Sequence, residues 1–339
     1  MAGHAVGPGY TPRVNESSSS SSRQPATAIF RSPFFAAHDN PHHVENQRRL
    51  QAIEQRLQSQ GLLDGRPLPE FADAPLAILE TVHNAWYVER LDRLAMGGGA
   101  MLDADTYVGP DSYEVALRAA GAAVGAVDWV MSARSTTSFA LVRPPGHHAT
   151  PERGMGFCLF NNAAAAAVRA LQSGADRVAI VDWDVHHGNG TQDVFYRSAD
   201  VLVCSVHQYP FYPGTGARDE RGEGAGEGLN INVPLLAGQQ DDVYLQVFDE
   251  TILPALRSFE PEIIIISAGY DAHIADPLGG MRLTEAGFAG MTELLLDVAD
   301  QTSGGRVAAI LEGGYDPAAL ARSVEATLRT LDGQPAIGV

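Results

Sequence analysis

The amino-acid sequence predicts an α/β domain with a central parallel β-sheet and helices on both faces. Short, continuous runs of apolar residues alternate along the chain with longer segments of helical periodicity. Continuous apolar runs are typical of strands buried on both faces of a parallel sheet, and their alternation with helices is typical of the α/β class. Polar clusters follow directly after the apolar runs, as expected at the carboxyl edge of such a sheet, where ligands bind.

Five strands are predicted where the apolar runs are short and rich in β-forming residues. They cover residues 138–142, 178–182, 201–206, 263–267 and 307–311. Helices are predicted where apolar residues recur with helical spacing. They cover residues 44–60, 112–131, 162–172, 242–257, 284–299 and 317–331. Thr284 and Asp316 stand at predicted helix starts, and Pro317 suits the first helical position because its φ is already helical.

The first 27 residues are predicted to be a disordered tail. They combine Gly, Pro and a serine run at 17–22 with too little apolar surface to fold. From Ala28 onward there is no second low-complexity linker and no internal repeat, so residues 28–335 are predicted to form one domain. The chain has 339 residues and is 45% hydrophobic and 19% charged, which provides ample material for a core.

Charge and composition argue against several classes of function. The formal net charge of -18 disfavours binding to nucleic-acid phosphates and is compatible with cationic substrates such as basic protein tails or polyamines. All 23 basic residues are arginine. No apolar run approaches the roughly 20 residues of a membrane helix, and no secretory signal pattern is present, so a cytoplasmic protein is predicted. Cys158 and Cys204 are therefore expected to be buried thiols, with a single disulfide as the alternative.

Asp184 and His186 follow the predicted strand 178–182 and are two residues apart. At the end of an extended strand such residues point the same way, so together they are able to ligate one divalent ion. A third ligand must come from another loop, and Asp276 is the best candidate. One His and two Asp leave a coordination position for water, which is typical of a catalytic zinc site. A metal held there would lower the pKa of water toward about 7 and polarise a carbonyl.

His147 and His148 form a tandem after the predicted strand 138–142. Adjacent histidines beside an activated water are suited to general base and general acid work near neutral pH. Asp182 and Asn189 lie on the same segment as the first two metal ligands and are expected to orient the histidines by accepting hydrogen bonds. A histidine pair on a surface loop is the alternative interpretation.

Tyr315 follows two glycines, so its loop is able to approach the site closely. Its hydroxyl is suited to donate to a carbonyl oxygen that becomes an oxyanion. Phe157, together with Phe211 or Tyr212, is a candidate wall of a narrow apolar channel. Combined with a metal and a histidine pair, these residues predict an amide or ester hydrolase that uses water directly. Cys158 is not expected to act as a nucleophile because its neighbours are apolar.

Six motifs occur in order along the chain: RPPGHH (143–148), GFCLFNN (156–162), VDWDVHHGNGTQ (181–192), FYPGTG (211–216), SAGYDAHIADPLGG (267–280) and LEGGYD (311–316). They resemble the motifs of the zinc-dependent histone deacetylase family, which includes acetylpolyamine amidohydrolases. The segment HVENQRRL (43–50) is similar to the HPExPxRL motif of that family. The resemblance covers roughly residues 30–330 and implies the arginase/deacetylase fold.

The resemblance implies roles for the polar residues. His148 matches the general base and acid of the family, and His147 matches an electrostatic partner that pairs with Asp182. Asn189 stands where class I enzymes carry aspartate, which makes the chain class II-like, and a neutral partner should leave His148 less basic. Zinc, with iron(II) as the alternative metal, would be held by the three ligands named above: Asp184, His186 and Asp276.

The resemblance also implies a substrate tunnel. Tyr315 matches the residue that polarises the scissile carbonyl, and the backbone of Gly156 matches a contact to the substrate amide. Phe157 and Tyr212 match the aromatic pair that lines an acyl-lysine tunnel, with tyrosine in place of the second phenylalanine. Polyamine-selective members carry a glutamate at the position of Leu278, so leucine favours a lysine substrate.

Two structural potassium ions are implied by the same resemblance. The first would lie near Asp182, Asp184, His186, Ser205 and Val206, and the second near Phe195, Ser198 and Val201. The leading interpretation is thus a zinc hydrolase that removes acyl groups from Nε-acyl-lysine in proteins or peptides. Its alternatives are a deacetylase of acetylpolyamines or another small amide, a non-catalytic acyl-lysine binding module, and a manganese hydrolase of the arginase type.

Overall fold

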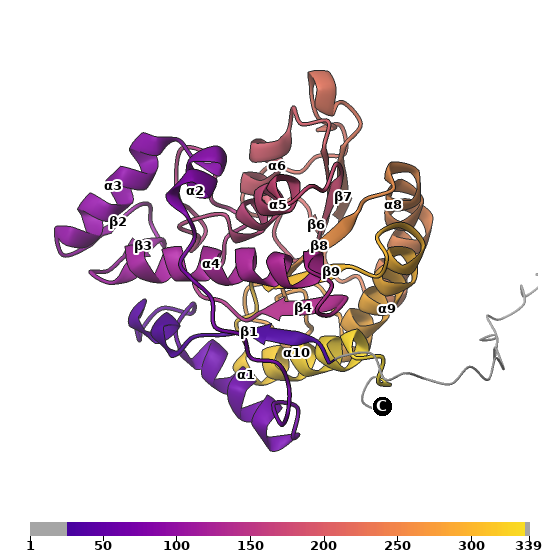
Figure 1. Ribbon diagram of the computed structural model, residues 1–339, viewed down its shortest axis with the longest axis horizontal. Helices are drawn as coiled ribbons and strands as arrows, with labels where there is room; N and C mark the ends of the chain where they lie inside the picture. The colour runs from indigo at the N-terminus through magenta and orange to yellow at the C-terminus, as the bar shows by residue number, and fades with distance from the viewer. Residues whose placement is uncertain (1–25, 336–339) are drawn as a thin grey trace, which may run out of the picture.

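A parallel β-sheet forms the centre of the molecule in the computed structural model, which describes residues 26–335 (Figure 1). Its seven strands are arranged in the order β1-β4-β9-β8-β5-β6-β7, and all neighbouring pairs are parallel. Their bounds, in that order, are Ala28–Phe30, Thr137–Ala140, Val307–Leu311, Ile263–Ala268, Val178–Asp182, Val201–Gln208 and Asn230–Leu235. Two short strands, β2 (Ala100–Met101) and β3 (Tyr107–Val108), form a separate antiparallel pair. The predicted α/β class is confirmed.

Helices cover both faces of this sheet (Figure 1). α4 packs against α5 on one face, and α10 lies between α1 and α9 on the other. The helices α1 to α10 are Arg48–Ser59, Leu76–Val82, Ala85–Met96, Ser112–Met131, Asn162–Gln172, Asn189–Phe195, Asp241–Val247, Leu253–Phe259, Glu285–Thr302 and Pro317–Leu331. A π-helical turn, Phe248–Ile252, joins α7 to α8, and two 3₁₀ turns cover Pro33–Ala37 and Gly224–Gly226.

All five predicted strands are present, and two further strands close the edges of the sheet. β5 and β9 have the predicted bounds, whereas β4 ends at Ala140 and β6 continues to Gln208. β1 and β7 were not predicted, since β1 has only three residues and the apolar run of β7 is interrupted by Asn232 and Pro234. Both are edge strands, where polar residues and proline are tolerated because only one side needs a ladder of hydrogen bonds.

The long helices were predicted better than the short ones. α4, α5 and α10 have the predicted bounds, and the cap of α10 is formed by Asp316, whose side chain accepts from the backbone N–H of Ala319. The helix predicted at 44–60 begins only at Arg48, and the one predicted at 242–257 is divided by the π-helical turn. α2, α3 and α6 were not predicted; α2 and α6 have seven residues each, too few for a clear helical period.

Thr27 belongs to the folded domain and not to the predicted tail. It is buried, its backbone N–H donates to Oδ1 of Asp332 at 2.9 Å, and its hydroxyl lies 2.9 Å from that of Thr137. These contacts join the start of β1 to the end of α10. Residues 1–25 of the predicted tail lie outside the described residues.

The order of the strands places the loops that carry the motifs side by side. β5 lies between β8 and β6, and Asp182 at its end pairs in register with Ser267 and Ser205. Because the strands are parallel, their carboxyl ends and the following loops gather at one edge of the sheet.

Among the helices of residues 26–335, none has the length and apolar character needed to cross a membrane.

Candidate active site

A cavity of about 240 Å³ opens at the carboxyl edge of the sheet. Its lining combines polar groups from the loops after β4, β5 and β9 with aromatic side chains. The lining residues are Asp105, His148, Gly156, Phe157, His186, Phe211, Tyr212, Leu278 and Tyr315. The predicted tunnel residues therefore meet in one cavity, and both Phe211 and Tyr212 contribute to it. Asp105 was not predicted, because its segment lies far from every motif in the sequence.

Asp184, His186 and Asp271 form a compact group at the base of this site. One potential ligand atom from each lies within 4.8 Å of the others. Nδ1 of His186 is 3.2 Å from Oδ1 of Asp184 and 3.1 Å from Oδ2 of Asp271. Both carboxylates are fully buried. One imidazole nitrogen and two carboxylate oxygens are a donor set that zinc and iron(II) accept, so the group fits a divalent metal.

The electrostatics of the group also fit a cation. Burial and the neighbouring Asp184 carboxylate raise the pKa of Asp271 to about 7. Burial alone would lower the pKa of His186, but its hydrogen bonds to Asp184 and Asp271 raise that pKa to about 10. Two carboxylates this close in a buried site repel each other unless a positive charge lies between them.

Asp276, the predicted third ligand, lies outside this group, and Asp271 takes its place. Oδ2 of Asp276 accepts from the backbone N–H groups of Tyr315 at 2.6 Å and Asp316 at 3.2 Å, and Oδ1 accepts from Leu278 at 2.9 Å. Asp271 lies nearer to the end of β8 and so remains at the sheet edge, where its Oδ1 accepts from the backbone N–H of Val185 at 2.8 Å.

Contrary to the prediction from the sequence, Asp184 and His186 do not project from the end of a strand. β5 ends at Asp182, so neither residue belongs to the strand. They meet because the chain bends after the strand, and the backbone N–H of His186 donates to Oδ1 of Asp184 at 2.9 Å. The alternation of side chains along a strand therefore does not explain their common direction.

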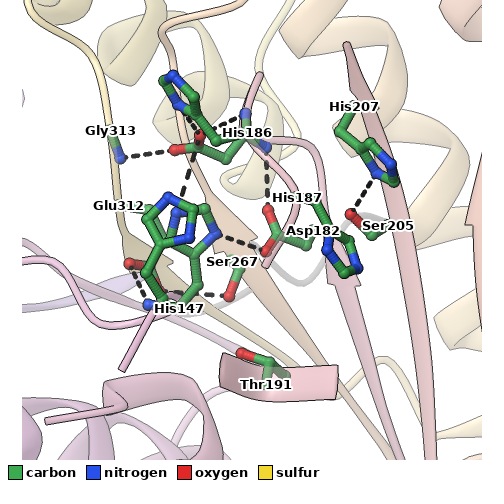
Figure 2. Close-up of polar contacts among 12 residues, drawn as sticks. His147, Asp182, His186, His187, Thr191, Ser205, His207, Ser267, Glu312 and Gly313 are labelled. Carbon is green, nitrogen blue, oxygen red and sulfur yellow. Dashed lines mark hydrogen bonds and ion pairs between the residues drawn. The ribbon is translucent and has the colours of Figure 1, made fainter. Parts of the chain in front are cut away.

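The two histidines of the tandem have different acceptors. Nδ1 of His147 lies 2.9 Å from Oδ2 of Asp182, and Nδ1 of His148 lies 2.8 Å from Oδ1 of Asn189. Figure 2 shows the ring of His147 directed at Asp182, while Glu312 accepts from the backbone N–H of His147 at 3.1 Å. The acceptors predicted for the pair are thus in contact with it.

The environments of the histidines separate their pKa values. Burial would lower the pKa of His147, but the charges of Asp182 and Asp184 raise it well above the usual range. Burial, followed by the charges of His147 and His186, lowers the pKa of His148 well below that range. At neutral pH this gives an imidazolium at His147 and a neutral base at His148, which is the separation that acid–base catalysis needs. Only His148 lines the cavity.

Tyr315 and the aromatic walls complete the cavity. The ring of Tyr315 meets that of Phe157 edge to face at 5.6 Å, and the guanidinium of Arg49 lies 5.0 Å from its centroid. Burial raises the pKa of the Tyr315 hydroxyl well above its usual value, so the hydroxyl stays a donor. Tyr212 meets His148 edge to face at 5.1 Å, and Phe211 stacks on His186 at 5.3 Å.

Gly156 has a φ of +55°, and Phe157 follows with a φ of +70°. A Cβ atom at Gly156 would lie 2.4 Å from Cδ2 of His148. This position therefore needs glycine both for its backbone conformation and for the close approach to the histidine.

Arg49 and Glu312 are buried beside the site, and neither was predicted as a site residue. The guanidinium of Arg49 donates to the carbonyl oxygens of Gly314 at 2.7 Å and of Glu312, and to Glu45 at 3.0 Å. Oε2 of Glu312 accepts from the backbone N–H of Gly146 at 2.6 Å. The motifs HVENQRRL and LEGGYD contain these residues, but charged residues in a motif do not reveal whether they touch substrate or hold a loop.

The residues expected near potassium remain a prediction. Ser205 lies beside Asp182 across the β5–β6 ladder, and its hydroxyl is 2.9 Å from Nδ1 of His207 (Figure 2). Phe195 and Ser198 are joined by a backbone hydrogen bond of 2.9 Å at the end of α6.

Both cysteines, Cys158 and Cys204, are free and buried. Burial raises the pKa of the Cys158 thiol well above its usual value, so this thiol is unsuited to act as a nucleophile.

Residues 43–331 match the sequence model of the histone deacetylase domain. The chain belongs to the histone deacetylase family. It is 43% identical over 279 residues to a histone deacetylase-like amidohydrolase of Pseudomonas aeruginosa, which covers 81% of this chain and 72% of that protein. It is 40% identical over 289 residues to a probable deacetylase of Archaeoglobus fulgidus, covering 85% and 80% of the two chains.

The fold agrees with this membership. The crystal structure of the HDA15 HD domain superposes with a TM-score of 0.88 at 39% identity, covering 93% of this chain and 90% of that one. The arginase/deacetylase fold implied by the motifs is thus confirmed. As a member of the family the chain is a hydrolase with deacetylase activity.

Proposed function

We propose that this protein is a zinc-dependent deacetylase that removes acetyl or other acyl groups from Nε-acyl-lysine in proteins or peptides. The observation that carries the proposal is the convergence of His148, His186 and Tyr315 on one cavity of about 240 Å³. A base, a metal ligand and an oxyanion donor in a single cavity form the set that hydrolysis of an amide by water requires.

Asp184, His186 and Asp271 would hold the metal, with iron(II) as the alternative to zinc. When bound, the metal supplies polarisation of the scissile carbonyl and a lower pKa for the attacking water. The structural potassium ions implied by the family motifs would lie behind these ligands, near Asp182 and Ser205.

The side chains of the site account for the proton transfers. Neutral His148 takes a proton from the attacking water as the new C–O bond forms, and returns it to the amine nitrogen as the C–N bond breaks. Imidazolium His147, held by Asp182, stabilises negative charge nearby. The hydroxyl of Tyr315 donates to the carbonyl oxygen as that oxygen becomes anionic. The products are a carboxylic acid and a free lysine amine.

The walls of the cavity suit an acyl-lysine. Phe157, Phe211 and Tyr212 present aromatic surface to the apolar methylenes of a lysine side chain. Leu278 adds apolar surface to the cavity, at the position where polyamine-selective members of the family carry a glutamate that would bind the distal ammonium of a polyamine. These features favour a lysine substrate over a polyamine.

An acetylpolyamine remains the second candidate because of one observation. Asp105 contributes a carboxylate to the lining of the cavity, and a second ammonium group of a polyamine would pair with it.

An enzyme of the arginase type is disfavoured, because among residues 26–335 only one group of potential metal ligands is found. Such an enzyme needs ligands for a metal pair.

The test compares an acetyl-lysine peptide with N-acetylated spermidine, putrescine and cadaverine, using purified protein of measured metal content. Faster turnover of the peptide that is lost on chelation and restored by zinc would support the proposal. Faster polyamine turnover would keep the mechanism and replace the substrate. Turnover that survives chelation, or an active Tyr315→Phe variant, would refute the mechanism.

A further inference from the structure

We propose that Asp276 is a positioning residue for Tyr315, and that it links the loop after β8, which carries Leu278, to the loop after β9, which carries Tyr315. The inference rests on the proposed function, because it assigns Asp276 an effect on the step that Tyr315 assists. Asp276 is not among the residues that line the cavity, and it is not part of the group formed by Asp184, His186 and Asp271.

The contacts of Asp276 are with backbone N–H groups of two cavity-lining segments. One carboxylate oxygen accepts from Tyr315 at 2.6 Å and from Asp316 at 3.2 Å, and the other accepts from Leu278 at 2.9 Å. Asp276 is only 8% exposed. Hydrogen bonds to an ionised acceptor are about twice as strong as those between neutral groups, so the carboxylate is a firm link between the segments.

Tyr315 depends on such a link because its own hydroxyl is not held. Within the part of the chain that the structure describes, no hydrogen bond to that hydroxyl is formed, as a free donor for substrate requires. Gly313 and Gly314 precede it, and Gly314 has a φ of +122°, a conformation that glycine adopts at little cost. The direction of Tyr315 therefore depends on the hydrogen bonds that hold this backbone, of which one runs from the N–H of Gly313 to Asp184 at 2.9 Å. Arg49 holds the carbonyl of Gly314, and Asp276 holds the N–H of Tyr315.

The first test uses the variants Asp276→Ala and Asp276→Asn on the metal-loaded, full-length protein. Displacement of a catalytic group by about 1 Å costs on the order of 100-fold in rate, so Asp276→Ala should lower kcat by about 10- to 100-fold with little change in KM. Asp276→Asn keeps one acceptor oxygen and should lose less. Asp241→Ala is the matched control, because Asp241 likewise accepts from the N–H and hydroxyl of Thr284 at 2.9 and 2.6 Å, away from the cavity.

A double-variant comparison shows whether Asp276 acts through Tyr315. Tyr315→Phe removes the donor, so adding Asp276→Ala to it should cause little further loss of kcat. Losses that multiply in the double variant would overturn the proposal. So would a fall in zinc content of Asp276→Ala to the level of Asp271→Ala, because Asp276 would then be a metal ligand.

Amide hydrogen exchange tests the link without any measurement of activity. In Asp276→Ala, and to a smaller extent in Asp276→Asn, the amides of Tyr315 and Asp316 should exchange at least about 10-fold faster than in wild type and in Asp241→Ala. Unchanged exchange in a variant with a native circular dichroism spectrum would overturn the proposal. If wild type hydrolyses none of the amides, the proposed function fails, while the exchange rates and zinc contents still decide the role of Asp276.

Discussion

Replacement of Gly156 by alanine should separate the geometry of the active site from the stability of the fold. Gly156 has a φ of +55°, a conformation that costs an alanine about 1–2 kcal/mol. The added Cβ would also lie 2.4 Å from Cδ2 and 2.9 Å from Cγ of His148, whereas ordinary contact begins at 3.4 Å. The histidine would have to move by about 1 Å and weaken its bond to Asn189, which is now 2.8 Å long.

This displacement should lower kcat of the deacetylation by about 100-fold, equivalent to about 2.7 kcal/mol in the activation barrier. The control is Gly174→Ala, since Gly174 has a φ of +97° and no atom within 4 Å of its Cβ position. It should lose about 1–2 kcal/mol of unfolding free energy in urea and keep wild-type kcat. If Gly156→Ala keeps more than half of the wild-type kcat, or if both variants lose activity equally, the reasoning is refuted.

Three further predictions concern the metal, the base and the buried charges. Asp271→Asn should weaken zinc binding by at least about 100-fold, measured by metal analysis after dialysis, and full zinc content would contradict its assignment as a ligand. Asn189→Asp places an anion beside His148, which raises the pKa of the imidazole. The acid limb of the pH profile of kcat/KM, along which His148 loses its proton, should therefore move up by about one pH unit. An acid limb that does not move would count against His148 as the base. Glu45 and Arg143 form a fully buried ion pair, with Nε of Arg143 2.6 Å from Oε1 of Glu45. Burial raises the pKa of Glu45, but the charge of Arg143 outweighs burial and lowers that pKa to about 2. The stability from this ion pair is therefore present above pH 4.5 and is lost as the pH falls through 2. Glu45→Ala should therefore lower the unfolding free energy at pH 7 by about 3–5 kcal/mol in urea, and a loss below 1 kcal/mol would show that the pair is dispensable.

The local pattern of the sequence was sufficient for the class of fold and for its buried elements. β5 and β9 and the helices α4, α5 and α10 have the predicted bounds, because continuous apolar runs, helical periodicity and the Asp316–Pro317 start are properties of neighbouring residues. The edge strand β7 was missed because one of its sides needs no partner, which relaxes the apolar pattern.

The types of residue that meet at the site were also predictable from the sequence. Every motif with polar residues follows a predicted strand or opens a predicted helix, and a parallel sheet brings such segments to one edge. The histidine tandem and Tyr315 were identified in this way, together with Asp182 and Asn189 as acceptors of the histidines.

The choice between Asp271 and Asp276 as the third member of the candidate metal group required the three-dimensional fold. Both lie in the loop after β8, and no periodicity applies within a loop, so the sequence offered no physical ground for choosing one. The fold turns Asp271 toward His186, and it turns Asp276 toward the N–H groups of Tyr315 and Leu278. Such directions depend on contacts between residues far apart in the chain, which is why two aspartates in one loop differ in what they touch.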